Sequence, residues 1–162
     1  MRKLLADNNI EGTVRVYGTP AEEGGSGKAY MARAGLFDDV DAVLSWHPGD
    51  VNRADAAPSL ALVSAEFRFT GTSAHAAAAP WRGRSALDAV MMMATGWEYK
   101  REHLPLTHRS HYIIRDGGDQ PNVVPSSASI WFYFRERDFD GTQALFETGK
   151  RMAEGAAMMT GT

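Results

Sequence analysis

The chain has no cysteine among its 162 residues, which excludes disulfide bonds and any metal site built from thiolates. No apolar run approaches the roughly 18 residues that a membrane-spanning helix needs. Neither sign of charge is in large excess, since 17 basic and 20 acidic side chains give a formal net charge of −3. This balance gives no reason to expect nucleic-acid binding. We therefore expect neither a membrane nor a nucleic acid as partner, and a cytoplasmic location.

The chain up to residue 50 has the pattern of a strand, a helix and a second strand. Residues 13–17 are β-branched, aromatic or basic, residues 22–34 suit a helix that begins with glycines, and residues 40–46 form a second apolar segment. A strand, helix and strand of this length form a βαβ unit, normally parallel with a right-handed crossover. The sequence therefore predicts α/β structure in this part.

Three polar side chains follow the predicted strand ends, where open parallel sheets bind their ligands. Glu22 and Glu23 are adjacent after the first strand, and His47 follows the second. Metal-dependent hydrolysis needs ligands for the ion and a base that takes a proton from water, and two adjacent glutamates can divide that work. The alternatives are acids that stabilise a helix N-terminus and a surface histidine. The residues alone leave both open.

The second part of the chain has the order β-α-β-β-α. This order has the alternation and helical spacing expected for strands over 61–70, 108–115 and 127–135, and helices over 83–102 and 139–157. It is the order of a ferredoxin-like α+β unit that lacks its last strand. A polar, alanine-rich stretch precedes it, so we expect two domains, residues 1–58 and 59–162.

Three further residues in this part are candidates for binding a substrate. His75 lies in a loop of small residues, where its imidazole could donate a hydrogen bond to an oxyanion. Asn122 lies in a turn-rich segment before a strand and could bond a ligand or close its own turn. Arg135, at the far end of that strand, could hold a carboxylate. A surface histidine and a solvated arginine are the alternatives.

Four short motifs, in this order, resemble those of the dinuclear zinc amidohydrolases of the aminoacylase and carboxypeptidase type (peptidase clan MH). They are Pro20-Ala21-Glu22-Glu23-Gly24-Gly25, Trp46-His47-Pro48, Ala74-His75-Ala76 and Asn122-Val123-Val124-Pro125. Within that family they are similar to the branch of indole-acetyl-amino-acid hydrolases. The resemblance implies cleavage of an N-acyl amino acid amide bond, such as that of p-aminobenzoyl-glutamate. It also implies that a βαβ piece of the catalytic domain is joined to a lid or dimerization domain.

The resemblance implies a role for each matching residue near the metals. Glu22 would be the general base and acid, Glu23 a ligand of one metal and His47 a ligand of the other. The metals would be two divalent ions, Zn²⁺ or Mn²⁺, in the full-length parent.

The resemblance also assigns roles in the lid domain. His75 would reach the active site of the partner subunit and stabilise the tetrahedral oxyanion, while Asn122 and Arg135 would bind the substrate near its carboxylate. The partner would be a second copy, bound through the lid domain, and a second subunit type is a further candidate.

The family's remaining ligand motifs lie upstream and downstream of the segment that this chain matches. We therefore expect an internal fragment that binds zinc poorly and is inactive by itself. The alternative is a non-catalytic dimerization module.

Overall fold

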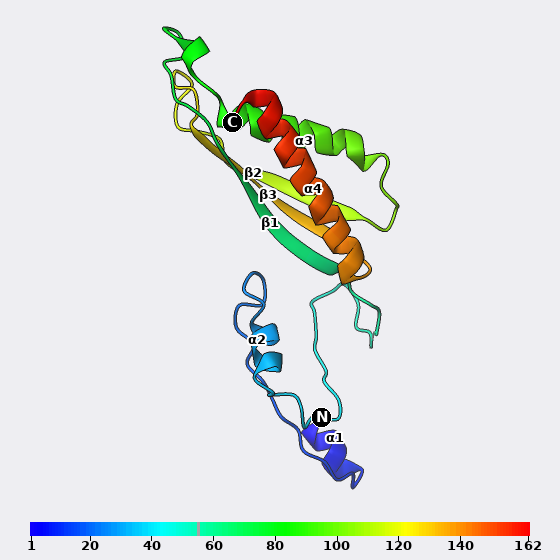
Figure 1. Ribbon diagram of the computed structural model, residues 1–162. Helices are drawn as coiled ribbons and strands as arrows, with labels where there is room; N and C mark the ends of the chain where they lie inside the picture. The colour runs from blue at the N-terminus through cyan, green and yellow to red at the C-terminus, as the bar shows by residue number, and fades with distance from the viewer. Residues whose placement is uncertain (55) are drawn as a thin grey trace. The chain divides into compact units, whose positions relative to one another are not determined.

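The computed structural model describes residues 1–54 and 56–162, which form two units that divide after Ala54 (Figure 1). No helix in the described part of the chain is long and apolar enough to cross a membrane. Each unit is considered by itself below.

The second unit is a three-stranded antiparallel sheet with two helices on one face (Figure 1). Its elements are β1 (Ala61–Thr70), the 3₁₀ helix η1 (Pro80–Arg82), α3 (Ala86–Arg101), β2 (Arg109–Asp116), β3 (Ser127–Glu136) and α4 (Phe139–Thr160). The strands lie in the order β1-β3-β2. The predicted β-α-β-β-α order is confirmed, and β1 agrees with its prediction at both ends.

The central strand β3 supplies the middle of the core. Its inward side chains are completely buried: Ala128, Ile130, Phe132 and Phe134. The rings of Phe132 and Phe134 stack with centroids 5.2 Å apart, and Trp97 of α3 meets both rings edge-on. Burial of each such aromatic side chain contributes about 1.5–3 kcal/mol. Gly149 lets α4 approach, because a Cβ there would lie 2.9 Å from Cζ of Phe134.

Polar contacts fix the ends of the helices and tie α3 to the sheet. The Ser85 hydroxyl accepts the backbone N–H of Asp88 at 3.1 Å, which caps α3 and explains why it begins at Ala86 rather than at residue 83. The indole N–H of Trp97 donates to the hydroxyl of Ser110 on β2 at 2.9 Å. The α3 helix is thereby held over the β2 side of the sheet.

The first unit contains only two short helices, α1 (Arg2–Asp7) and α2 (Gly27–Arg33). The strands predicted over 13–17 and 40–46 are wrong for this structure, since residues 1–54 contain no strand. The physical reason is that parallel strands need neighbouring strands and cover on both faces. No residue between 1 and 54 is buried, and Val16 and Trp46 are 93% and 85% exposed.

Local contacts nevertheless hold residues 13–17 beside the chain that follows α2. The guanidinium of Arg15 donates to both carboxylate oxygens of Asp39 at 2.6 Å and holds the pKa of that carboxyl below its usual value. The hydroxyl of Tyr17 donates to the carbonyl of Leu36 at 2.8 Å, and its ring meets Phe37 edge-on. These contacts give the extended segment a fixed neighbour without a sheet.

Candidate functional site

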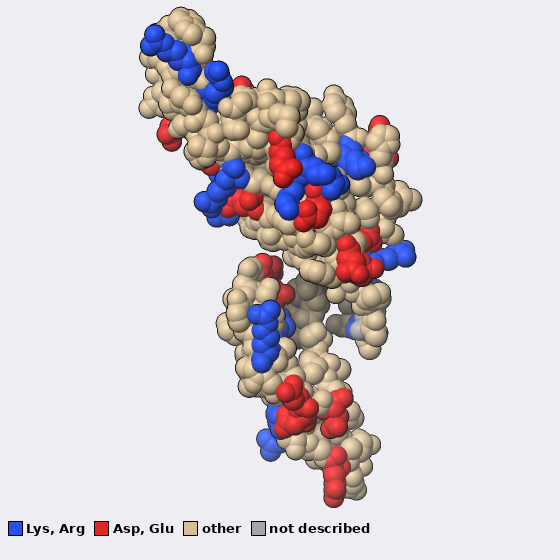
Figure 2. Space-filling view, viewed as in Figure 1, with Lys and Arg blue, Asp and Glu red and all other residues tan. Residues whose placement is uncertain are grey.

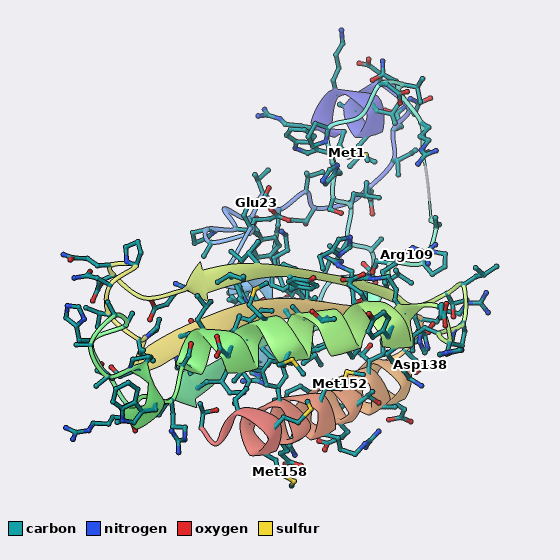
Figure 3. All side chains as sticks on the ribbon, turned by 90° about the horizontal axis from the view of Figure 1, so that it is seen from above. Met1, Glu23, Arg109, Asp138, Met152 and Met158 are labelled. Atoms are coloured by element: carbon teal, nitrogen blue, oxygen red, sulfur yellow. The ribbon has the colours of Figure 1, made fainter. Side chains whose placement is uncertain are left out.

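Glu22 and Glu23 lie in a tight turn before α2, and both are exposed (Figure 3). The helix begins at Gly27 and has no acidic residue in its first turn, so the pair does not occupy the helix positions considered above as an alternative. Ala21 and Ser26, on either side of the pair, have φ of 56° and 52°, which is costly for residues other than glycine. A Cβ at Gly27 would lie 2.0 Å from the carbonyl oxygen of Pro20. The turn therefore depends on a glycine at its end and presents both carboxylates to solvent.

His47 has a defined tautomer. Its Nδ1 lies 2.9 Å from the carbonyl oxygen of Pro48, and because a carbonyl oxygen only accepts, Nδ1 carries the proton. The lone pair is then on Nε2, and the side chain is exposed. This is the arrangement that orients a histidine ligand toward a metal ion.

The residues of this chain fit only part of a metal site. Two carboxylates and one imidazole nitrogen are suitable donors for a divalent ion such as Zn²⁺. Across residues 1–54 and 56–162, however, no three His, Asp or Glu side chains are grouped to hold an ion. Glu22, Glu23 and His47 are thus not brought together within this chain.

In the second unit, two loops are joined side by side at one end of the sheet. The loop between β1 and α3 forms isolated bridges within itself and with the β2–β3 loop, Thr72 to Arg84 and His75 to Val123. The backbone N–H of Ala76 donates to the carbonyl of Asn122 at 2.9 Å. The structure therefore brings His75 and Asn122 together from separate loops, as substrate-contacting residues would need to be.

The imidazole of His75 has the opposite tautomer to that of His47. The backbone N–H groups of Ala77 and Ala78 both donate to its Nδ1, each at 3.2 Å. Because Nδ1 accepts, the proton is on Nε2, and the exposed side chain presents an N–H donor to solvent. Such a donor can stabilise a developing oxyanion.

The base of this loop is closely packed. A Cβ at Gly71 would lie 1.9 Å from the carbonyl oxygen of Arg84, and one at Gly83 would lie 2.9 Å from a methyl carbon of Val124. Only glycine fits at these two contacts, so the loop that carries His75 has a fixed foundation.

Arg135 is not brought to this end of the unit. It lies near the far end of β3, half-buried, with its guanidinium 5.9 Å from the ring centroid of Tyr133. Its neighbours across the sheet are Leu62 and Arg109. Within one chain Arg135 and Asn122 thus lie at opposite ends of a ten-residue strand, and they do not form a common binding site.

Sequence reasoning missed Trp81 and Arg82, which lie in η1 on the same loop as His75. Trp81 is 72% exposed. The signal available in the sequence was an aromatic residue directly after Pro80, in a loop otherwise made of small residues.

Comparison with known proteins gives consistent matches. A family model described as a peptidase dimerisation domain (M20_dimer) matches residues 61–157. The chain is 45% identical over its whole length to one of the two types of p-aminobenzoyl-glutamate hydrolase subunit in Escherichia coli, of which it covers 34%. Over 91% of its length it is 38% identical to Xaa-Arg dipeptidase of Mus musculus, again covering 34% of that protein. The chain spans about a third of the length of the curated relatives it matches.

A solved structure, the aminobenzoyl-glutamate utilization protein from Klebsiella pneumoniae, superposes with a TM-score of 0.53 and 30% identity. The match covers 62% of this chain and 26% of that one.

Proposed function

This chain belongs to the M20 peptidase dimerisation domain family, and from that premise we propose that it is part of a metal-dependent amidohydrolase that cleaves N-acyl amino acids. A suitable substrate is p-aminobenzoyl-glutamate, which the name of the relative from Escherichia coli specifies. The observation that carries the proposal is the pair of opposite histidine tautomers. His47 offers a nitrogen lone pair, which suits a metal ligand, and His75 offers an N–H, which suits an oxyanion.

Glu23 and His47 would each hold one of two divalent ions, Zn²⁺ or Mn²⁺. Such ions, when bound, polarise the scissile carbonyl and lower the pKa of water. The free carboxylate of Glu22 would accept a proton from the attacking water and give it to the nitrogen of the leaving amino acid. The adjacent position of the two glutamates suits this division, because neighbouring side chains leave the turn in different directions.

The second unit would supply His75 to the active site of a partner subunit. There its Nε2–H would donate to the carbonyl oxygen as negative charge develops on it. Asn122, joined to the same loop, would contact the substrate near its carboxylate. Arg135 would act at a separate position, since it lies at the other end of β3.

Residues 1–54 would be one corner of a larger catalytic domain. The identity to the relative from Escherichia coli extends over the whole chain, including this part. We infer that the segments 13–17 and 40–46 become strands when the rest of that domain supplies their neighbours. The remaining metal ligands would come from the two thirds of the relative's length that this chain does not cover.

The test is hydrolysis of p-aminobenzoyl-glutamate by the full-length protein that carries this chain, with release of glutamate as the readout. We expect turnover with Zn²⁺ or Mn²⁺ and its loss on chelation, because the ions polarise the carbonyl. The isolated chain of 162 residues should show neither turnover nor tight binding of two ions, since it carries only part of the ligand set. An inactive metal-loaded full-length protein, or an isolated chain that holds two zinc ions tightly, would contradict the proposal.

Dimerization is the second candidate function, and an exposed stripe on α3 favours it. Met92, Gly96 and Tyr99 lie on one face of the helix at helical spacing. Met92 and Tyr99 are 42% and 73% exposed, and a Cβ built at Gly96 would meet no atom within 4 Å. A mid-helix glycine costs about 1 kcal/mol relative to alanine, and close approach of another backbone is a common reason for keeping one. We infer that a second copy packs here.

Met92→Glu is expected to weaken self-association of the full-length protein at least about tenfold, because a charge would be buried between the two helices. Sedimentation velocity across a concentration series measures this effect. Met159→Glu is the matched control, since Met159 is 65% exposed on α4, away from the stripe. Equal behaviour of the two variants would contradict this interface, and pairing only with a different chain would indicate a second subunit type.

A further inference from the structure

Trp81 is an aromatic side chain presented to solvent beside the candidate oxyanion donor. It lies in η1, six positions after His75 in the same loop, and is 72% exposed. Single exposed hydrophobic residues are common on protein surfaces and need no explanation. The backbone that holds Trp81 is what distinguishes it.

Hydrogen bonds fix this backbone on both sides of the indole. The N–H of Ala79 donates to the carbonyl of His75 at 3.0 Å, and the N–H of Gly83 donates to the carbonyl of Pro80 at 2.9 Å. The guanidinium of Arg84 donates to the carbonyl of Gly83 at 2.6 Å. Trp81 and His75 are therefore held on one rigid loop, and a rigid aromatic residue loses little conformational entropy when a ligand binds.

The side chain that follows Trp81 adds a positive charge. Arg82 is exposed and forms no salt bridge with any residue that the structure describes. Figure 2 shows basic side chains gathered at the tip where this loop lies. An aromatic face beside an unpaired cation matches a ligand that carries both an aromatic ring and a carboxylate.

We propose that Trp81 is a specificity-determining residue that stacks on the aromatic acyl group of the substrate while His75 meets its carbonyl oxygen. This inference rests on the proposed function and names the substrate class as N-aroyl amino acids. The N-acyl group must be aromatic for the contact to form, because stacking needs a ring face. An N-acetyl amino acid would bind without it.

The experiment compares kcat/KM of the full-length enzyme on p-aminobenzoyl-glutamate and on N-acetyl-glutamate, which share the leaving amino acid. Trp81→Leu should lower kcat/KM about tenfold for the aromatic substrate, the size of one aromatic contact, and leave that for the acetyl substrate unchanged. Trp81→Phe should retain most of the aromatic activity. Phe139→Leu is the matched control, because Phe139 is 64% exposed at the start of α4, beyond the other end of β3.

Equal losses on both substrates, or no loss on either, would overturn the role of Trp81 and leave the proposed function standing. Wild-type enzyme that cleaves N-acetyl-glutamate but not the aromatic substrate would overturn the substrate class alone. Failure of the wild-type enzyme on both substrates would overturn the proposed function and this inference with it.

Discussion

Glu22→Gln in the full-length protein is expected to lower kcat about a thousandfold, within the range that a general acid–base group contributes. The amide keeps the size of the side chain and its place in the turn, but it cannot take a proton from water or return one to the leaving nitrogen. KM should change little, because Glu22 would act on the reacting water and not on the bound substrate. Steady-state kinetics on p-aminobenzoyl-glutamate measures both values.

Glu23→Gln provides the matched control, because the two residues are adjacent and equally exposed. If Glu23 is a ligand, its variant should lose bound metal, whereas Glu22→Gln should retain it. Metal content per subunit, measured beside activity, separates the two roles. Normal turnover by Glu22→Gln would exclude it as the base, and metal loss from both variants would make both residues ligands.

The second unit was predictable from the sequence because its elements carry their own signal. Along β3, Ile130, Phe132 and Phe134 alternate with partly exposed residues, and the structure buries all three. The antiparallel sheet needs no strand from outside the unit to bury this face. Local pattern and final fold therefore agree, and the helix boundary at Ser85 differs only because its side chain caps α3.

The first unit was not predictable in the same way. The segments 13–17 and 40–46 have the composition of strands, but a parallel strand takes its stability from neighbours and covering helices. Residues 1–54 bury none of their side chains, so nothing in this chain rewards pairing the two segments. Composition indicated what these residues do inside a larger sheet and not what they do here.

For the candidate site, the sequence indicated residue types but not their chemistry. His47 and His75 were candidates from motif position, whereas their tautomers depend on the backbone groups that each Nδ1 meets. Arg135 was a candidate from its charge, and only the strand register shows that it lies far from Asn122. Trp81 escaped notice because exposure and loop rigidity are properties of the fold.

His75→Ala is expected to lower kcat about a hundredfold to a thousandfold, the usual loss when one oxyanion donor is removed. The loop should survive, because its glycine contacts and backbone bonds do not use the imidazole beyond the two N–H groups of Ala77 and Ala78. A melting temperature close to that of the wild type checks this point. Substantial activity in the variant would remove His75 from the mechanism.

The location of His75 in a partner's active site predicts recovery of activity on mixing two inactive variants. In a symmetric dimer of His75→Ala with Glu22→Gln, one site combines both substitutions and the other has both wild-type residues. Random exchange makes half of the dimers mixed, so about a quarter of wild-type activity should return. Mixing under conditions that allow subunit exchange, followed by the same assay, measures the recovery. If His75 instead served its own subunit, every site would carry one substitution, and no recovery would occur.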